Sequence, residues 1–305
     1  MNAVFAFPGQ GSQHAGMLDA IPEPDALDRL LDAAEALTGR ELRRLADEGT
    51  TEELRDTVVA QPLIYLACWT WGSVLIDVGL RPVAVAGHSL GELAALAVAG
   101  VYSPEAGLEL VCERARLMAE CAAAAPGAMS AVLGLSATAV EDAIAGVSEV
   151  WVANDNAPAQ VVISGTHSAI TEASEALLER GAKRIVPLDV AGAFHTPLMH
   201  EAAARFADLI RAAEIRDATI PVAQNTRPTP SVSGEEIREA LIGQMDSRVR
   251  WTETMVAIAS AYRPVTLIET GPGSVLTGLA RRIEGLPAVC VEETGVEALI
   301  EEVLR

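Results

Sequence analysis

Apolar residues fall along the chain in two patterns, short uninterrupted runs and longer segments with helical spacing. Three mainly apolar runs are short enough to be buried strands: residues 3–7, 83–86 and 265–269. Three longer segments repeat apolar side chains at helical spacing: residues 25–45, 61–78 and 104–123. This alternation of strands with helices predicts an α/β fold with a mostly parallel sheet.

In residues 126–191 the expected strands and helices are shorter and follow one another closely. This segment begins after a change of composition at Ala124-Ala125-Pro126-Gly127 that indicates a hinge. The expected order is strand, helix, strand, strand, helix and strand: residues 128–135, 138–145, 150–154, 160–165, 167–180 and 184–190. Residues 154–158 carry polar and proline side chains that predict a turn. Because this βαββαβ order is that of a ferredoxin-like subdomain, we expect a large domain of residues 1–125 and 192–305 with residues 126–191 inserted.

The chain after residue 191 returns to the pattern of the first third. Helices are expected at five segments: residues 200–213, 235–245, 251–261, 275–283 and 296–304. Strands are expected at three: residues 220–224, 265–269 and 288–291. These elements complete the large domain.

Between residues 83 and 100, a buried strand meets an alanine-rich helix through Gly-His-Ser-Leu-Gly at residues 87–91. This spacing is the layout of a nucleophile elbow, a sharp strand-to-helix turn that exposes Ser89. The helix N-terminus behind Ser89 offers N–H groups to a developing oxyanion. Because the five-residue pattern also arises by chance as a glycine-rich turn with a solvated serine, it needs support from elsewhere.

A second glycine-rich loop leaves the first strand as Phe-Pro-Gly-Gln-Gly-Ser-Gln at residues 7–13. Its glycines let backbone amides approach a ligand closely, and Gln10 adds a side-chain amide. The loop lacks the Gly-Lys-Ser/Thr of a phosphate-binding loop, which disfavours nucleotide binding. The remaining alternative is a tight turn that only closes the strand.

A serine nucleophile needs a base, and neutral imidazole fits this role near pH 7. Of the five histidines, His195 lies in an irregular segment between Gly-Ala-Phe and Thr-Pro, where catalytic groups are common. The others are expected in a loop, beside Ser89 but pointing elsewhere, at a helix cap and on a solvated helix face: His14, His88, His167 and His200. A standard α/β-hydrolase places its histidine near the C-terminus, so a simple esterase is disfavoured.

Composition narrows the classes of partner. A net charge of −20, from 22 basic and 42 acidic side chains, argues against nucleic acid and anionic membranes. Residues 1–7 lack a basic start and a long apolar stretch, so we expect no signal peptide, and residues 93–102 reach only about half of a membrane span. Four scattered cysteines without ligand spacing predict buried free thiols in a reducing cytoplasm and no metal site: Cys68, Cys112, Cys121 and Cys290.

Two arginines, Arg114 and Arg116, lie two positions apart on the helix expected at residues 104–123 and so point to different faces. The apolar stripe of that helix consists of Leu108, Val111, Ala115 and Met118. We expect one arginine at the edge of the stripe and the other in solvent. An ordinary surface charge is the alternative for either. With a single lysine in the chain, carboxylate recognition would use the bidentate geometry of arginine.

Six motifs occur in order along the chain. They are Phe-Pro-Gly-Gln-Gly-Ser-Gln at 7–13, Gly-His-Ser-Leu-Gly-Glu at 87–92, Glu-Arg-Ala-Arg-Leu-Met at 113–118, Ala-Gln-Val-Val-Ile-Ser-Gly at 159–165, Phe-His-Thr-Pro-Leu-Met at 194–199 and Gly-Pro-Gly-Ser-Val-Leu-Thr-Gly-Leu at 271–279. Together they closely resemble the malonyl-CoA:acyl carrier protein transacylases of bacterial fatty acid synthesis and the related acyltransferase domains of polyketide synthases. The resemblance covers essentially the whole chain. The fold class expected is an α/β-hydrolase-like large domain with a nucleophile elbow and an inserted ferredoxin-like subdomain.

Carried over residue by residue, the resemblance implies that Ser89 is the nucleophile and His195 the general base. It implies an oxyanion hole made by the backbone amides of Gln10 and Leu90. The family has no catalytic aspartate and orients its histidine through a main-chain carbonyl, which falls on Gln244. The resemblance therefore explains why the search for a triad finds no acid.

The resemblance also implies three substrate-binding residues. Arg114 would bind the free carboxylate of malonate and hold the thioester carbonyl over Ser89, and Gln61 would line the acyl pocket. Acetyl-CoA lacks this carboxylate and would leave the arginine unpaired. Phe194, before the histidine, goes with malonyl specificity in polyketide acyltransferase domains, whereas Ser goes with methylmalonyl. Many stand-alone transacylases carry Ser there and still use malonyl.

The reaction implied runs in two half-steps through a malonyl-Ser89 ester, with malonyl-CoA as donor and the phosphopantetheine thiol of an acyl carrier protein as acceptor. It needs no bound cofactor, and we expect a cytoplasmic monomer. Because carrier proteins are acidic and so is this chain, docking needs a local basic patch. Candidates, which could equally be ordinary surface charges, are Arg281-Arg282, Lys183-Arg184, Arg248 and Arg250.

Other functions stay open. In the same class are the malonyl-loading subunit of malonate decarboxylase and a discrete polyketide acyltransferase; the intact His88 and Leu90 favour the ordinary transacylase. A thioesterase or esterase would use water as the acceptor. A non-catalytic scaffold is disfavoured because the residues of the implied site are all present: Ser89, His195, Gln10 and Arg114.

Overall fold

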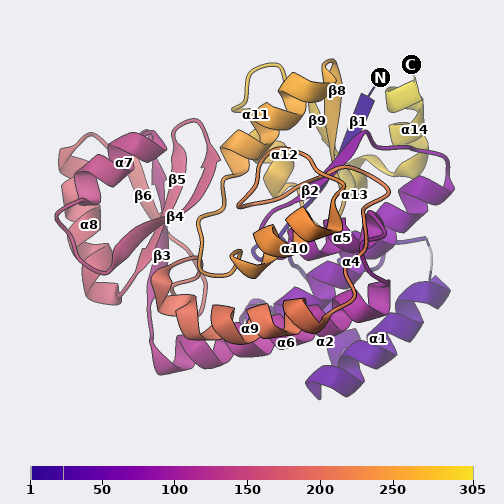
Figure 1. Ribbon diagram of the computed structural model, residues 1–305, viewed down its shortest axis with the longest axis horizontal. Coiled ribbons are helices and arrows are strands. Elements are labelled where there is room, and N and C mark those ends of the chain that lie inside the picture. The colour runs from indigo at the N-terminus through magenta and orange to yellow at the C-terminus, as the bar shows by residue number, and fades with distance from the viewer. Residues whose placement is uncertain (1, 23, 305) are drawn as a thin grey trace.

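A computed structural model describes residues 2–22 and 24–304, which fold around two β-sheets (Figure 1). The larger sheet has five strands in the order β7-β2-β1-β8-β9, and each pair of neighbours is parallel. Its strands are β1 (Asn2–Phe7), β2 (Ala84–Gly87), β7 (Val222–Ala223), β8 (Val265–Glu269) and β9 (Ala288–Cys290). The predicted parallel sheet is confirmed.

Helices cover both faces of this sheet, so alternate residues of one strand belong to different cores. Phe5 and Phe7 of β1 pack on one face with helices from the first 124 residues, whereas Val4 and Ala6 pack on the other with helices from the last third of the chain. The first group is α1 (Pro24–Thr38), α4 (Thr57–Asp77), α5 (Gly91–Val98) and α6 (Pro104–Ala124), and the second is α11 (Trp251–Tyr262) and α12 (Val275–Ala280). Burial on both faces is why these strands are continuous apolar runs in the sequence.

The remaining helices of this part of the fold connect or flank the sheet. They are α2 (Leu42–Glu48), α3 (Thr51–Leu54), α9 (His200–Ala212), α10 (Gly234–Ile242), α13 (Val291–Thr294) and α14 (Val296–Leu304), with a short 3₁₀ turn at Pro197–Met199. Helix α9 lies along α6 at the lower edge of the view in Figure 1.

The second sheet forms a smaller layer at the left of Figure 1 and has a core of its own. Its four strands are antiparallel in the order β4-β5-β3-β6: β3 (Ala128–Leu133), β4 (Val150–Ala157), β5 (Gln160–Gly165) and β6 (Arg184–Pro187). Helices α7 (Ala137–Ile144) and α8 (His167–Glu179) contribute to this core. The βαββαβ arrangement agrees with the sequence. The boundaries at residues 126 and 191 stay a prediction, which the separate core supports.

Strand β4 is longer than the sequence predicts. The polar residues from Asn154 to Asn156 continue the strand, with register shifts against β5, where a turn was expected. On its other side, Asp155 N–H donates to Val249 O at 2.9 Å and Val249 N–H donates to Ala153 O at 2.8 Å. These polar side chains mimic a turn composition because this part of β4 lies against the segment between α10 and α11 and against α11 rather than in the core of the smaller sheet.

A few other boundaries also differ from the prediction. Helix α4 begins at Thr57 rather than at Gln61, because the Asp56 side chain accepts from Val58 N–H and caps the helix there. By length and composition α4 could cross a membrane, but 83% of its apolar window is buried, as in the core helix of a folded protein. Three of the free cysteines are buried, whereas Cys121 is partly exposed.

Candidate active site

The turn between β2 and α5 has the geometry that an elbow requires. Ser89 has φ 50°, in the left-handed region that side chains other than glycine rarely adopt. A Cβ on Gly87 would collide with the backbone of Gly91, and one on Gly91 would collide with the carbonyl of Phe7. Both glycines are therefore needed for this close approach, and the turn directs Ser89 away from the sheet.

The structure brings Ser89 and His195 together although 106 positions separate them in the chain. Ser89 Oγ lies 2.7 Å from His195 Nε2, and His195 Nδ1 lies 3.1 Å from the main-chain oxygens of both Gln244 and Ser247. Because carbonyl oxygens only accept hydrogen bonds, Nδ1 carries the proton and Nε2 is free to accept from the serine hydroxyl. His195 also has a positive φ, 59°.

The environment of His195 keeps its imidazole neutral. Burial, followed by the positive charge of Arg114 and the neighbouring His88, lowers the pKa of His195 to about 3, although the two carbonyl contacts oppose this shift. A neutral imidazole near pH 7 is the form that can accept the proton of Ser89.

Arg114 of α6 lies in the same cluster and has no solvent exposure. Its Nη1 donates to Gln61 Oε1 at 2.9 Å, and its Nη2 donates to Gln244 Oε1 at 3.0 Å and to Ser89 Oγ at 3.1 Å. Burial lowers the pKa of Arg114 to about 10, opposed by the charge of Glu92, so the guanidinium stays positive at neutral pH. All of its hydrogen-bond partners are neutral.

Arg116 has the opposite environment, as the helical spacing predicts. It is partly exposed on the surface of α6 and forms ion pairs of 2.6 Å with Glu113 and Glu120. The two arginines of the same helix therefore separate into one buried cation within the site and one surface charge.

A cavity of about 70 Å³ opens beside these residues. Its polar lining includes Gln10 and Asn154, each with one buried side-chain atom that has no partner: Gln10 Nε2 and Asn154 Oδ1. The apolar lining includes Met118, Leu188 and Phe194. The predicted residues Gln61, Leu90 and Phe194 all line this cavity with Ser89 and His195, so one small space collects the whole predicted set except Gln244.

Gln244 contributes more than the main-chain carbonyl that the sequence predicts. Its Nε2 donates to Ser89 O at 2.7 Å while its Oε1 accepts from Arg114. The side chain is fully buried and ties the arginine to the backbone of the elbow.

Two further residues hold the elbow and were missed from the sequence. Asn225 accepts from Ser89 N–H at 2.7 Å through Oδ1 and donates to Gly87 O at 2.6 Å through Nδ2. Glu92, in the first turn of α5, accepts from Asn225 N–H at 2.7 Å. Burial raises the pKa of Glu92 to about 7, against the opposing effect of its hydrogen bonds and of Arg114. Of these two residues, only Glu92 is marked in the sequence, because it directly follows the elbow pentapeptide.

The smaller sheet reaches the site through β4. His88 Nε2 lies 2.8 Å from Asn156 Oδ1, and burial lowers the pKa of His88. His88 is among the residues that line the cavity, but its ring bonds to β4 and lies edge-on to Trp251, 5.5 Å between ring centroids, in line with the expectation that it points away from Ser89.

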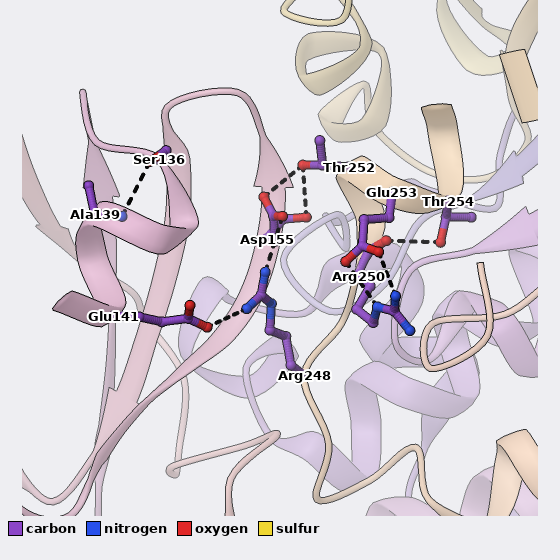
Figure 2. Close-up of polar contacts among 9 residues, drawn as sticks. All are labelled: Ser136, Ala139, Glu141, Asp155, Arg248, Arg250, Thr252, Glu253 and Thr254. Carbon is purple, nitrogen blue, oxygen red and sulfur yellow. Dashed lines mark hydrogen bonds and ion pairs between the residues drawn. The ribbon is translucent and has the colours of Figure 1, made fainter. Parts of the chain in front are cut away.

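Figure 2 shows a second contact of β4, with the segment that follows Gln244. Asp155 accepts from Thr252 Oγ1 at 2.7 Å and from Arg248 Nη2 at 3.3 Å, while Arg248 Nη1 pairs with Glu141 of α7 at 2.6 Å. The segment that orients His195 is thereby fastened to the smaller sheet.

Arg250, the residue before α11, pairs with Glu253 in the first turn of that helix at 2.5 Å, on the right of Figure 2. Arg248 and Arg250, both candidates for carrier docking, are therefore already paired with carboxylates.

The other histidines lie in different surroundings. His14 Nε2 contacts Glu292, exposed His200 contacts Asp246 at 3.1 Å, and His167 is the first residue of α8. Within residues 2–22 and 24–304, no three histidine, cysteine or acidic side chains are grouped so that they could hold a metal ion.

Comparisons with known proteins agree on one family. The acyl transferase domain family matches residues 4–291. The malonyl CoA-acyl carrier protein transacylase of Synechocystis sp. is 40% identical over 284 residues, which cover 92% of this chain and 94% of the relative. The enzyme of the same name from Bacillus subtilis is 39% identical, over 92% and 89% of the two chains.

Among solved structures, a malonyl-transacylase in complex with its type II PKS acyl-carrier protein is similar over 100% of both chains, with a TM-score of 0.91 and 35% identity. The match spans both sheets of the fold and every residue of the cavity. By sequence and by structure, the chain belongs to the acyl transferase domain family and to its malonyl CoA-acyl carrier protein transacylases.

Proposed function

We propose that this protein transfers a malonyl group from malonyl-CoA to the phosphopantetheine thiol of an acyl carrier protein, through an ester on Ser89. The observation that carries the proposal is the buried Arg114 cation, 3.1 Å from Ser89 Oγ. A positive charge fixed beside a serine–histidine pair suits an acyl group that ends in a carboxylate. No cofactor is required.

In the first half-reaction Ser89 Oγ attacks the thioester carbon of malonyl-CoA while His195 Nε2 takes the hydroxyl proton. The backbone amides of Gln10 and Leu90 would stabilise the oxyanion. The C–S bond then breaks, and the imidazolium returns its proton to the CoA sulfur. The main-chain oxygens of Gln244 and Ser247 stabilise the positive imidazolium between these two steps, in the role that an aspartate has elsewhere.

In the second half-reaction the carrier thiol replaces CoA. His195 takes the thiol proton, the sulfur attacks the malonyl ester, and the proton passes to Ser89 Oγ as the ester bond breaks. Because water can make the same attack, a transferase must favour the thiol. The apolar wall of the cavity, including Met118 and Phe194, supports such a preference by limiting space for ordered water.

Recognition of malonate follows from the partners of Arg114. Gln61 and Gln244 hold the guanidinium in place without neutralising its charge. An arriving carboxylate would gain a charge-assisted bidentate contact, whereas an acetyl group would desolvate the arginine without compensation. Phe194, 5% exposed, stands beside His195 in the cavity wall and would oppose a substituent on the acyl α-carbon.

Carrier docking would use the basic side chains that remain exposed. Lys183-Arg184 and Arg281-Arg282 are exposed pairs, in contrast to the ion-paired Arg248 and Arg250. Because the net charge is −20, such local patches are needed to attract an acidic carrier. The proposed setting is the cytoplasm with a monomeric enzyme.

Intact-mass spectrometry tests the proposal directly. After mixing with malonyl-CoA, the wild-type protein should gain one malonyl group, Ser89→Ala should gain none, and a phosphopantetheinylated carrier protein should discharge the adduct. Failure to form the adduct, or equally fast discharge by water alone, would contradict the transferase function and favour a thioesterase.

The acceptor is tested in the same assay. Carrier proteins from fatty acid synthesis and from a type II polyketide system are compared as dischargers at equal concentration, together with the carrier subunit of a malonate decarboxylase. The carrier that discharges the adduct fastest identifies the pathway role, and Lys183→Glu with Arg184→Glu should slow only this second half-reaction.

A further inference from the structure

Asn225 makes contacts that the proposed reaction does not assign to any residue. Its side-chain amide bridges the backbone of the two residues on either side of His88. Its Oδ1 accepts from Ser89 N–H at 2.7 Å, and its Nδ2 donates to Gly87 O at 2.6 Å. The residue is 1% exposed and follows the two-residue strand β7, more than 130 positions after the elbow. One buried side chain therefore joins the backbone on both sides of the turn.

The orientation of this amide is fixed by its partners. An N–H can only donate and a carbonyl oxygen can only accept, so the oxygen must face Ser89 and the nitrogen must face Gly87. Any side chain that keeps both contacts needs one acceptor and one donor in the same plane. Of the common residues of this size, asparagine meets that requirement at every pH near neutrality.

Asn225 is itself held by the helix that the elbow begins. Glu92 Oε2 accepts from Asn225 N–H at 2.7 Å, and Glu92 Oε1 accepts from Gln224 Nε2 at 3.1 Å. Glu92 has no solvent exposure and lies three positions after Ser89. These hydrogen bonds join Gly87, Ser89, Asn225 and Glu92 into one buried network.

This network holds Ser89, whose backbone conformation is strained. Ser89 has φ 50°, a conformation that persists only where surrounding contacts determine it. The direction of the Cα–Cβ bond of Ser89 depends on its backbone torsions. A change of φ or ψ would therefore move Oγ away from His195 Nε2, from which it lies 2.7 Å. The Asn225 amide bonds to the N–H of Ser89 and therefore restrains this torsion directly.

We propose that Asn225 is a positioning residue for acyl transfer, which holds the nucleophile elbow so that Ser89 Oγ faces His195, with Glu92 fixing Asn225 in turn. The proposal rests on the proposed function of Ser89 as the nucleophile. A role in stability alone is the alternative, and the two differ in what happens to the rate of acylation in molecules that remain folded.

The variants are Asn225→Ala, Asn225→Asp and the control Gln224→Met. Gln224 is the neighbouring residue, also 1% exposed and also bonded to Glu92, but it does not contact the elbow. The rate of malonyl-enzyme formation is measured by rapid quench and mass spectrometry, with the folded fraction taken from urea unfolding. We expect Asn225→Ala to lose on the order of 10²-fold in this rate with a KM for malonyl-CoA changed by less than about threefold, as for a small misplacement of reacting atoms. Gln224→Met should keep its rate within about threefold of wild type at equal folded fraction.

Asn225→Asp gives a readout that a purely structural role would not move. A neutral carboxyl group can accept from Ser89 N–H and donate to Gly87 O, whereas a carboxylate can only accept. The charged or titratable groups around this position are Glu92, His88, His195 and Arg114, so each profile is divided by that of wild type. The rate of Asn225→Asp relative to wild type should rise as pH falls from 8 to 5.5, while that of Asn225→Ala should stay flat.

Two results would overturn the proposal. One is an Asn225→Ala acylation rate within threefold of Gln224→Met at equal folded fraction, and the other is a flat relative profile for Asn225→Asp. Failure of the proposed function has a different signature, because Ser89→Ala would then still form the adduct or the wild-type protein would form none. A sulfonyl fluoride that modifies reactive serines provides a second probe of Ser89, independent of malonyl-CoA.

Discussion

Ser89 and His195 both have left-handed backbone conformations, yet the structure holds them by different kinds of contact. The Ser89 side is a buried network of amides and a carboxylate, formed by the side chains of Asn225, Gln244 and Glu92. The His195 side depends on two main-chain carbonyls, at Gln244 and Ser247. The segment that carries those carbonyls is fastened to the smaller sheet by partly exposed charged groups.

The difference separates two requirements of one reaction. The nucleophile needs a fixed direction, which short buried hydrogen bonds provide at the cost of sensitivity to any single deletion. The base needs an orientation and a neutral resting state, which carbonyl contacts and burial provide. Partly exposed ion pairs add little free energy each, so the His195 side should tolerate loss of its outer contacts better.

Removal of the two reacting groups should produce the largest effects. Ser89→Ala removes the atom that forms the ester and should abolish the malonyl adduct. His195→Ala leaves Ser89 without its base and should slow acylation on the order of 10²- to 10⁴-fold while the adduct still forms slowly. Rapid-quench mass spectrometry distinguishes the two, and an equally complete loss in both variants would mean that His195 does more than accept a proton.

The next largest effect should separate the two arginines of α6. Arg114→Ala removes the cation within the buried network and should lower kcat/KM for malonyl-CoA on the order of 10²- to 10³-fold, with loss of discrimination against acetyl-CoA. Arg116→Ala, on the surface of the same helix, should change kcat/KM less than about twofold. Steady-state kinetics with both thioesters test this, and equal effects of the two substitutions would contradict a substrate role for Arg114.

The free energy of unfolding should depend on pH with opposite slopes for His195 and Glu92. The pKa of His195 is lowered from 6.5 to about 3, so its contribution is present above pH 6.5 and is lost as pH falls toward 3. The pKa of Glu92 is raised from 4.5 to about 7, so its contribution is present below pH 4.5 and is lost as pH rises toward 7. Between pH 4.5 and 6.5 the two slopes, each up to about 1.4 kcal/mol per pH unit, oppose one another.

Urea unfolding of Glu92→Gln and His195→Gln over this range separates the two contributions. Glu92→Gln should become less stable as pH falls from 6.5, because the His195 slope is no longer opposed. His195→Gln should become less stable as pH rises from 4.5. The same pH dependence in both variants and in wild type would show that neither shift is coupled to folding.

The smallest effect should come from the contact of Arg248 with β4 and α7. Arg248→Met removes the bonds to Asp155 and Glu141 and should lower kcat by about two- to fivefold, with KM unchanged and the free energy of unfolding within about 1 kcal/mol of wild type. Arg205→Met is the matched control, because it loses a surface ion pair of 3.0 Å with Glu120 that touches neither side of the site. A loss of kcat in Arg248→Met no larger than in the control would mean that the smaller sheet does not position His195.

The sequence predicted the elements that depend on local pattern. Apolar runs identified the strands of the larger sheet, and the elbow pentapeptide with its flanking strand and helix located Ser89. His195 was found because it is the histidine in an irregular segment. The opposite faces of Arg114 and Arg116 followed from helical spacing alone.

What the sequence did not predict depends on contacts between distant segments. Asn225 follows a strand of only two residues, and no local pattern distinguishes it from an ordinary polar turn residue. Asn154, Asp155 and Asn156 have the composition of a turn because their strand lies at a junction where polar partners replace an apolar core. In each case the partner that explains the residue lies far away in the chain, and only the folded backbone brings the two together.

Strand β4 also limits how freely this fold can exchange its parts. It pairs with β5 along one edge and bonds through Ala153 and Asp155 to Val249 on the other, so its backbone is bonded both to its own sheet and to the segment between α10 and α11. A chimaera that replaces the smaller sheet by that of a relative would inherit a foreign β4 against its own residues 247–252. We therefore expect an exchange of the smaller sheet between relatives to succeed when β4 and residues 247–252 are taken from the same protein. Exchanging only the residues between 126 and 191 is not sufficient.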